Sequence, residues 1–180
     1  MDEFNILEVQ DFDRIIFLDR DGTINEPPYS TWVTRVDELR YLDLNYELFR
    51  RISELRFGFV IVTNQRGLST GALNIEEYEK INLKLAGKFE SESINLITIL
   101  TCPHSYSCVD CRKPNPGMLT YALKKFHIPS RDCWMLGDQE SDSQCAKAAG
   151  VPFKFVNNNK DEKGHTITTN QALEEILLNG

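Results

Sequence analysis

The sequence contains no apolar run long enough to cross a lipid bilayer, which takes about 20 consecutive apolar residues. Residues 1–5 (MDEFN) are largely polar and lead into no long apolar stretch, so we predict no signal peptide. From both absences we expect a cytoplasmic protein without a membrane partner.

Positive charge is also scarce. The chain has 20 Lys and Arg against 27 Asp and Glu, a formal net charge of -7 and an isoelectric point of about 5.0. Because neutralising a nucleic-acid backbone takes a surplus of Lys and Arg, this balance disfavours a general nucleic-acid binder. A small phosphorylated substrate is still allowed, since a few local cations and a metal ion can hold it.

The cysteines are odd in number and cluster in one segment, which disfavours a disulfide framework. There are five, and three of them lie within residues 102–111 as Cys102-x-His104-x3-Cys108-x2-Cys111. Three thiolates and an imidazole are the ligands of a tetrahedral structural Zn²⁺ site, and such clustering in a cytosolic chain indicates metal ligation. The alternative is a set of free or buried thiols. Cys133 and Cys145 lie outside this zinc loop (residues 102–111), and we expect them to pack as small hydrophobic side chains.

The composition is typical of one soluble globular domain, which we place over residues 1–180. The chain is 41% hydrophobic and 26% charged. Apolar runs predict strands at 15–18, 59–62, 96–100, 133–136 and 153–156. Periodic apolar positions predict helices at 46–56, 74–90, 118–126, 143–149 and 172–178, with Asn45 and Asn74 as N-caps and Gly58 ending the first helix. This alternation favours an α/β fold, a three-layer, doubly wound and mainly parallel sheet.

The first strong strand runs directly into an acidic turn, Asp19-Arg20-Asp21-Gly22-Thr23. Ligands of open α/β sheets bind outside the carboxyl ends of the strands. Two carboxylates at that place are costly to bury unless a cation or a reaction uses them. A single Asp there would more often be a turn or cap residue. Because polar and charged side chains also follow the other strands, a metal-assisted site is favoured instead.

Polar side chains follow the other strands as well. They are Thr63 and Asn64 after the second strand, Arg112 and Lys113 in the loop after the third, and Asp138 and Asp142 after the fourth. Carboxylates from two strands suit Mg²⁺, while a hydroxyl and a lysine commonly bind phosphate. A carboxylate can also accept a phosphoryl group as a nucleophile.

Over residues 14–156 these motifs resemble those of the haloacid-dehalogenase-like hydrolase superfamily. The four motifs appear in order as Asp19-Arg20-Asp21-Gly22-Thr23, Thr63-Asn64-Gln65, Lys113 in Cys111-Arg112-Lys113-Pro114, and Gly137-Asp138 with Asp142. More narrowly, residues 17–25, 62–65, 102–104 and 111–114 resemble the subgroup of D-glycero-D-manno-heptose 1,7-bisphosphate phosphatase and the histidinol-phosphatase domain. The resemblance implies a Rossmann-like fold of this superfamily with a minimal cap and a zinc-binding loop.

The resemblance also implies a two-step mechanism. Asp19 would attack phosphorus and form an aspartyl-phosphate, and Asp21 would protonate the leaving oxygen and then deprotonate the attacking water. Thr63 and Lys113 would bind the transferring phosphoryl group. Mg²⁺ would be held by Asp19, the backbone carbonyl of Asp21 and Asp138, with Asp142 as a ligand or a support for one.

The zinc loop of the resembled subgroup begins Cys-Pro-His and ends Cys-Arg-Lys-Pro, as here. Relatives usually place the last two cysteines one residue apart, whereas Val109 and Asp110 separate Cys108 from Cys111 in this chain. Cys108 is therefore the ligand that departs from the pattern. Zinc would be structural and would position Arg112 and Lys113.

For the leaving group, the resemblance implies contacts from residues 26–30, Asn64 to Arg66, and Arg112. Arg112 could pair with a second phosphate, which would suit a bisphosphate. The alternative for Arg66 and Arg112 is a solvated loop charge. Thr70 stands where the heptose phosphatases tend to have an Arg, which weakens the bisphosphate assignment.

We therefore predict a monomeric, Mg²⁺-dependent phosphomonoester hydrolase of carbohydrate metabolism that takes a small sugar phosphate. The favoured substrate is D-glycero-D-manno-heptose 1,7-bisphosphate, used for lipopolysaccharide precursors. The alternatives are histidinol phosphate or another small phosphometabolite, and, in another class, a phosphoacceptor signalling module without turnover. A polynucleotide 3′-phosphatase is disfavoured by the net acidity.

Overall fold

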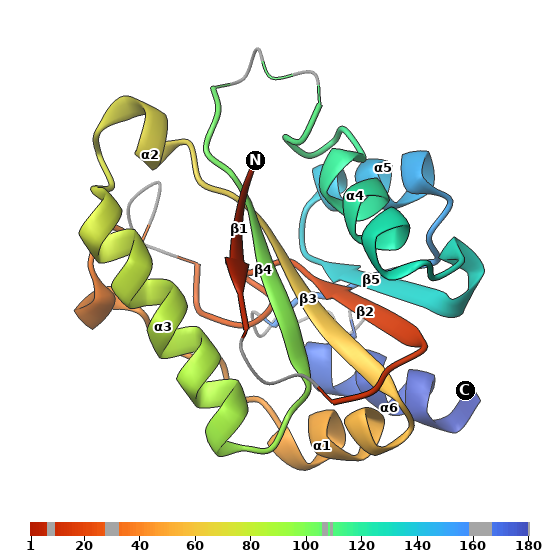
Figure 1. Cartoon of the computed structure of the whole chain (residues 1–180). Helices are drawn as coiled ribbons and strands as arrows, with labels where there is room; N and C mark the ends of the chain where they lie inside the picture. Colours follow the sequence, from red (N-terminus) through yellow and green to blue (C-terminus); the bar gives the residue numbers. More distant parts are fainter. Residues whose placement is uncertain (7–9, 28–32, 106–107, 109, 159–166, 180) are drawn as a thin grey trace.

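A single six-stranded sheet organises the computed structural model, which describes residues 1–6, 10–27, 33–105, 108, 110–158 and 167–179 (Figure 1). The strand order is β1-β4-β3-β2-β5-β6, with β1 antiparallel to β4 and all other pairs parallel. The strands are β1 (Asp2–Asn5), β2 (Arg14–Leu18), β3 (Phe57–Asn64), β4 (Leu96–Cys102), β5 (Cys133–Gly137) and β6 (Phe153–Phe155). The predicted mainly parallel α/β sheet is confirmed.

Helices cover both faces of the sheet. They are α1 (Tyr46–Glu54), α2 (Gly67–Thr70), α3 (Ile75–Ser91), α4 (Gly117–Phe126), α5 (Glu140–Ala149) and α6 (Thr169–Asn179), with short 3-10 turns at Val36–Glu38 and Ser130–Asp132. All five predicted strands and all five predicted helices are present. The sequence did not predict β1 or α2, and α5 begins three residues before the predicted Ser143.

Successive residues of β2 belong to different cores, which explains why its apolar run is continuous. Ile16 and Leu18 pack in the core under α1, α3 and α6, whereas Ile15 and Phe17 pack in the core under α4 and α5. All four side chains are fully buried. A parallel strand covered on both faces needs apolar side chains on both, without the alternation of a half-exposed strand.

Two predicted helix starts are confirmed by their caps. The Asn45 side chain accepts a hydrogen bond from the Glu47 backbone N–H (3.2 Å), and Asn74 accepts one from Glu77 N–H (2.9 Å). Each cap satisfies a backbone donor that the first helical turn leaves without a partner. The Glu77 carboxylate in turn accepts from the Val36 N–H (2.9 Å), so it joins α3 to the preceding 3-10 turn.

The prediction that Gly58 ends the first helix was wrong. Helix α1 ends at Glu54, and the chain reverses at Arg56, whose φ is 65°. Gly58 lies inside β3, where a Cβ atom would come within 2.1 Å of the Ile97 side chain on β4. This glycine is therefore a packing requirement of the sheet rather than a helix stop.

Among the described residues, no helix has both the length and the apolar character that a membrane crossing would require.

Replacing Gly58 with Ala should lower the free energy of unfolding by about 1–3 kcal/mol, because the new methyl group overlaps Ile97. Urea unfolding followed by circular dichroism measures this change. Gly87→Ala is the matched control, since a Cβ at this position in α3 meets no atom within 4 Å. The control should raise stability by up to about 1 kcal/mol. Equal effects of the two substitutions would contradict the packing role of Gly58.

Candidate active site

The carboxyl ends of the central parallel strands meet at one edge of the sheet. Leu18 of β2 lies in register with Ile61 of β3 and Leu136 of β5. The Asp19 backbone N–H then donates to the Leu136 carbonyl at 2.9 Å, so this carboxylate begins where β5 ends. The strands thus bring together residues that lie far apart in the sequence.

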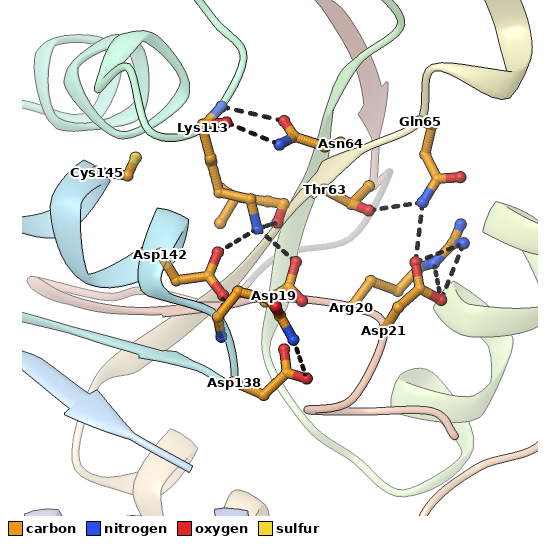
Figure 2. Close-up of polar contacts among 12 residues, drawn as sticks. Asp19, Arg20, Asp21, Thr63, Asn64, Gln65, Lys113, Asp138, Asp142 and Cys145 are labelled. Atoms are coloured by element: carbon orange, nitrogen blue, oxygen red, sulfur yellow. Dashed lines mark hydrogen bonds and ion pairs between the residues drawn. The ribbon is translucent and has the colours of Figure 1, made fainter. Parts of the chain in front are cut away.

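Lys113 is the centre of the site. Its ammonium group donates to an oxygen of Asp19 and to the Val62 backbone carbonyl (2.9 Å), and it forms an ion pair with Asp142 Oδ1 (2.7 Å) (Figure 2). Lys113 is 4% exposed, Asp19 7% and Asp142 0%. Charges buried to this degree are tolerated only when they are paired and hydrogen-bonded. The loop after β4 therefore has to reach back to β2 and α5.

The buried charges shift one another's protonation. Burial raises the pKa of the Asp19 carboxyl to about 8; the Lys113 charge opposes this rise, and the neighbouring Asp142 carboxylate adds to it. Burial alone would lower the pKa of Lys113, but Asp142 and Asp19 raise it above its usual range, so the ammonium stays charged. The crowded carboxylates disfavour one another's ionisation, and a divalent cation bound among them would favour their charged forms.

Two glycines let carboxylates approach the backbone closely. A Cβ on Gly22, whose φ is +91°, would lie 2.2 Å from Asp138 Oδ2, and a Cβ on Gly137 would lie 2.5 Å from the Asp142 carboxylate. Asp142 is also fixed by the Gln139 N–H, which donates to its Oδ2 at 3.0 Å. Any larger residue at either glycine would push a carboxylate out of the site.

Three carboxylates could hold a divalent cation. Oxygens of Asp19, Asp138 and Asp142 lie within 4.8 Å of one another. Asp138 Oδ1 is buried and has no hydrogen-bond partner among the described residues. An all-oxygen donor set of this kind fits Mg²⁺, a hard ion that takes carboxylate ligands and keeps several waters. The Asp21 carboxylate is not part of this group.

Asp21 is held on the other side of Asp19 from Lys113 (Figure 2). Its two oxygens accept hydrogen bonds from Arg20 Nη2 (2.9 and 3.1 Å), Asn25 Nδ2 (2.8 Å) and Gln65 Nε2 (3.0 Å). Gln65 Nε2 also donates to Thr63 Oγ1 at 2.8 Å, which joins the ends of β2 and β3. The sequence analysis missed Arg20 and Asn25. A cationic and an amide side chain in or near an acidic turn after a buried strand would have indicated them as hydrogen-bond donors to its carboxylates.

Asn64 contacts the backbone of Lys113. Its Nδ2 donates to the Lys113 carbonyl (3.0 Å), and its Oδ1 accepts from the Lys113 N–H (3.1 Å). This reciprocal pair fixes the loop that carries Lys113 to the end of β3. Arg66 is the N-cap residue of α2, and Arg112 Nη1 donates to the His104 carbonyl at 3.4 Å.

Part of the predicted leaving-group loop can be placed. Within residues 26–30, Glu26 and Pro27 are exposed, and residues 28–30 lie outside the described part of the chain. Thr70 is the last residue of α2, and its hydroxyl donates to backbone carbonyls of the same turn.

The four predicted zinc ligands form one cluster. His104 Nδ1 lies 3.7 Å from Cys102 Sγ and 3.2 Å from Cys111 Sγ, and the sulfur atoms of Cys108 and Cys111 are 3.6 Å apart. Ligands about 2.0–2.3 Å from a tetrahedral zinc ion lie roughly 3.3–3.8 Å from one another. The two soft ligand types and their spacing therefore fit Zn²⁺, Cys108 included.

The thiols of this cluster differ in their ease of ionisation. Burial raises the pKa of Cys102 to about 12. For Cys108 burial acts in the same direction, but backbone N–H groups of Asp110, Arg112 and Cys111 outweigh it and lower its pKa to about 6. A metal ion could thus bind first where a thiolate already exists and then favour ionisation of its neighbours.

The two remaining cysteines lie outside the cluster. Cys133 and Cys145 are fully buried in the core under α4 and α5, which confirms the prediction that they pack as small hydrophobic side chains. The Cys145 thiol donates to the Asn115 carbonyl at 3.2 Å.

Comparisons with known proteins identify relatives of this chain. Residues 110–177 match a family model described as HAD-hydrolase-like. The chain is 34% identical over 149 residues to D-glycero-beta-D-manno-heptose-1,7-bisphosphate 7-phosphatase of Escherichia coli (strain K12), which covers 78% of this chain and 77% of the relative. It is 31% identical over 142 residues to the bifunctional histidine biosynthesis protein HisB of Legionella pneumophila (strain Lens), covering 78% of this chain and 40% of that protein.

A solved structure shows the same fold. The crystal structure of D,D-heptose 1,7-bisphosphate phosphatase from B. bronchiseptica, complexed with magnesium and phosphate, superposes with a TM-score of 0.80. The match covers 93% of this chain and 99% of that chain at 24% sequence identity.

Purified protein should contain about one equivalent of Zn²⁺ per chain by elemental analysis, because the cluster supplies a complete tetrahedral ligand set. Cys111→Ser should reduce the zinc content to near zero and lower thermal stability. Cys133→Ser changes a buried cysteine outside the cluster and should retain zinc. A folded, zinc-free wild-type protein would refute the site.

The raised pKa of Asp19 predicts a pH dependence of stability in metal-free protein. Because the folded carboxyl keeps its proton up to about pH 8 and the unfolded one only to about pH 4, the folded state binds more protons in between. The free energy of unfolding should therefore fall as pH rises through this window. Urea unfolding with a chelator measures it, and Asp19→Asn should flatten the slope. Parallel curves for the two proteins would contradict the assignment.

Proposed function

The chain belongs to the haloacid-dehalogenase-like hydrolase superfamily, in its heptose bisphosphate phosphatase subgroup, and it is a phosphatase; from this premise we propose that it is a Mg²⁺-dependent phosphomonoesterase that forms an aspartyl-phosphate. The observation that carries the proposal is the buried ammonium of Lys113 between Asp19 and Asp142 at the ends of the central strands. A phosphoryl group beside Asp19 would meet this fixed positive charge. Such preorganised charge stabilises an oxyanion transition state more strongly than flexible charge in water.

Asp19 is the proposed nucleophile. One of its oxygens attacks phosphorus, the bond from phosphorus to the leaving oxygen breaks, and the aspartyl-phosphate forms. Lys113 and Thr63 hold the phosphoryl oxygens. Asn64 contributes indirectly, because it fixes the backbone of Lys113 through two hydrogen bonds.

Asp21 is the proposed acid and base. Its proton passes to the leaving oxygen in the first step, and it takes a proton from the attacking water in the second. The three donors around its carboxylate fix the direction in which it faces. Gln65 couples this orientation to Thr63.

Magnesium would be held by Asp19, Asp138 and Asp142, with the Asp21 backbone carbonyl as a further ligand, and would neutralise charge on the phosphoryl oxygens. The chain supplies the geometry through Gly22 and Gly137, which leave space for the carboxylates. The zinc cluster would be structural, since its ligands close a tetrahedron without an open position.

For the substrate we propose the 7-phosphate of D-glycero-D-manno-heptose 1,7-bisphosphate, a precursor of lipopolysaccharide. The E. coli relative bears this activity in its name. Arg112, beside Lys113, and Arg66, after the Thr63 motif, would contact the second phosphate and the sugar. Asn64 and Gln65 would act indirectly, because Asn64 holds the Lys113 backbone and the buried Gln65 bonds Asp21 and Thr63. We also propose a cytoplasmic, monomeric enzyme, because a site with three thiolates persists in a reducing compartment.

Histidinol phosphate is the second candidate substrate. The similarity to the Legionella histidine biosynthesis protein supports it. Thr70 supports it as well, since a monophosphate substrate does not need an additional Arg at that position. Both candidates are phosphate esters of primary alcohols, so the same mechanism serves either.

A substrate panel tests the proposal. Phosphate release is measured with Mg²⁺ for heptose 1,7-bisphosphate, histidinol phosphate, glucose 6-phosphate and p-nitrophenyl phosphate. We expect the highest kcat/KM for heptose 1,7-bisphosphate and release of one phosphate per molecule. Asp19→Asn, purified in parallel, should lose more than about 10³-fold in kcat because no other group can take its role. Equal activity of wild type and Asp19→Asn would refute the mechanism, and a preference for histidinol phosphate would select the second candidate.

A further inference from the structure

A set of buried polar side chains lies behind Asp21, on the side away from Lys113. We call it the inner polar cluster; its members are Arg20 after β2, Gln65 after β3, Tyr78 and Asn82 on α3, and Thr101 on β4. Each is at most 5% exposed, and Arg20 is the largest fully buried side chain of the described part of the chain. None of the predicted catalytic roles uses Arg20, Tyr78, Asn82 or Thr101.

The members of the cluster are neighbours. Arg20 and Gln65 meet on the Asp21 carboxylate, and Thr101 lies in register with Thr63, the other partner of Gln65. The Tyr78 hydroxyl lies beside the Thr101 and Asn82 side chains. Burial raises the pKa of Tyr78, whereas hydrogen bonding to the Thr101 and Asn82 side chains and the Arg20 charge act in the opposite direction.

Several polar atoms of the cluster lack a hydrogen bond of good geometry to any described residue. They are Arg20 Nη1, Gln65 Oε1, Tyr78 Oη, Thr101 Oγ1 and both amide atoms of Asn82. Buried polar atoms in folded proteins almost always have a partner, either protein or ordered water. Here six atoms from five residues lack a hydrogen bond of good geometry, and they include both donors and acceptors.

The required partner has to be small, neutral and able both to donate and to accept. An anion is disfavoured because the Arg20 charge is already balanced by Asp21 at 2.9 Å. A metal ion is disfavoured because the Arg20 guanidinium beside it is also positively charged. Buried water meets all requirements, since each molecule typically makes about three hydrogen bonds to buried polar groups.

We propose that the inner polar cluster binds ordered water that links Tyr78, Asn82 and Thr101 to Arg20, and that this link positions Arg20 and through it Asp21. Arg20 holds the Asp21 carboxylate with two nitrogens: Nη2 donates to both oxygens and Nε donates to Oδ1 at 3.3 Å. Its second terminal nitrogen, Nη1, is buried and has no hydrogen-bond partner among the described residues. Without a partner on Nη1, the buried guanidinium could tilt and carry the carboxylate with it. Tyr78 and Asn82 are therefore positioning residues, and Asp21 alone exchanges the proton.

The inference rests on the proposed role of Asp21 as the general acid, and leaving-group chemistry separates positioning from folding. An alkyl phosphate has a poor leaving group and needs the proton, whereas p-nitrophenyl phosphate has a good one and does not. The value of kcat/KM reports only steps up to aspartyl-phosphate formation, so hydrolysis of the intermediate does not enter. A partly unfolded preparation loses activity equally on both substrates.

The test compares Tyr78→Phe and Asn82→Leu with wild type on p-nitrophenyl phosphate and on the best alkyl phosphate of the panel. We expect kcat/KM for the alkyl phosphate to fall about tenfold, and that for p-nitrophenyl phosphate to fall less than about twofold. Tyr41→Phe is the matched control. It removes a hydroxyl that donates to the Lys84 carbonyl of α3 at 3.0 Å, and α3 is also the helix that carries Tyr78 and Asn82. It should leave the ratio of the two values unchanged.

Asp21→Asn separates failure of this inference from failure of the proposed function. If Asp21→Asn loses activity equally on both substrates, the acid role is wrong. If Asp21→Asn is selective but Tyr78→Phe and Asn82→Leu are not, the positioning role is wrong.

A crystal structure of the wild-type protein tests the water directly. We expect an ordered water about 3 Å from Arg20 Nη1 and from at least one of Tyr78 Oη and the Asn82 amide. A cluster closed by direct protein contacts, without water, would overturn the proposal.

Discussion

The candidate active site depends on one constraint, the burial of the Lys113 ammonium group among carboxylates. The Lys113 ammonium group is buried together with Asp19 and Asp142, and it forms an ion pair with each. Without these contacts, its charge would be uncompensated in the interior of the protein. This requirement explains several distant features at once. The loop after β4 reaches back across the sheet, Asn64 holds its backbone, and Gly137 leaves space for the Asp142 carboxylate. A cation bound by the carboxylates would act against the same excess of negative charge.

Much of this arrangement could be predicted from the sequence, because it depends on local patterns. Apolar runs marked every strand of the parallel part of the sheet, and side chains with obvious chemistry followed four of them. The four predicted zinc ligands were recognised from their residue types and spacing and from the resemblance of their loop, and their sulfur and nitrogen atoms form one cluster in the structure. The N-caps Asn45 and Asn74 could be predicted because a short polar side chain just before a segment with helical periodicity commonly caps a helix.

Other features could not be predicted because they depend on what lies across the sheet. Gly58 looks like a helix stop in sequence, and only the Ile97 side chain on the neighbouring strand shows why it is a glycine. Strand β1 is short and polar, and it pairs at the sheet edge with a segment almost 100 residues away. Asn64 was assigned to the substrate from its motif, yet both ends of its amide contact the Lys113 backbone. The contacts of Arg20 and Asn25 with Asp21 were missed because their position beside the acidic turn does not show that both side chains are buried.

The position of β2 in the sheet has a consequence for synthesis on the ribosome. The strand emerges early, but its two neighbours are β3, which follows soon after, and β5, which begins only at Cys133. The counter-ion of Asp19 follows 94 residues later in the chain. Until Lys113 is made, the nascent chain carries the Asp19 carboxylate without its counter-ion. Until β5 is made, the central strand β2 has one open edge. Such an edge can pair with other chains, so the protein depends on a partner strand, β5, that is made late in synthesis.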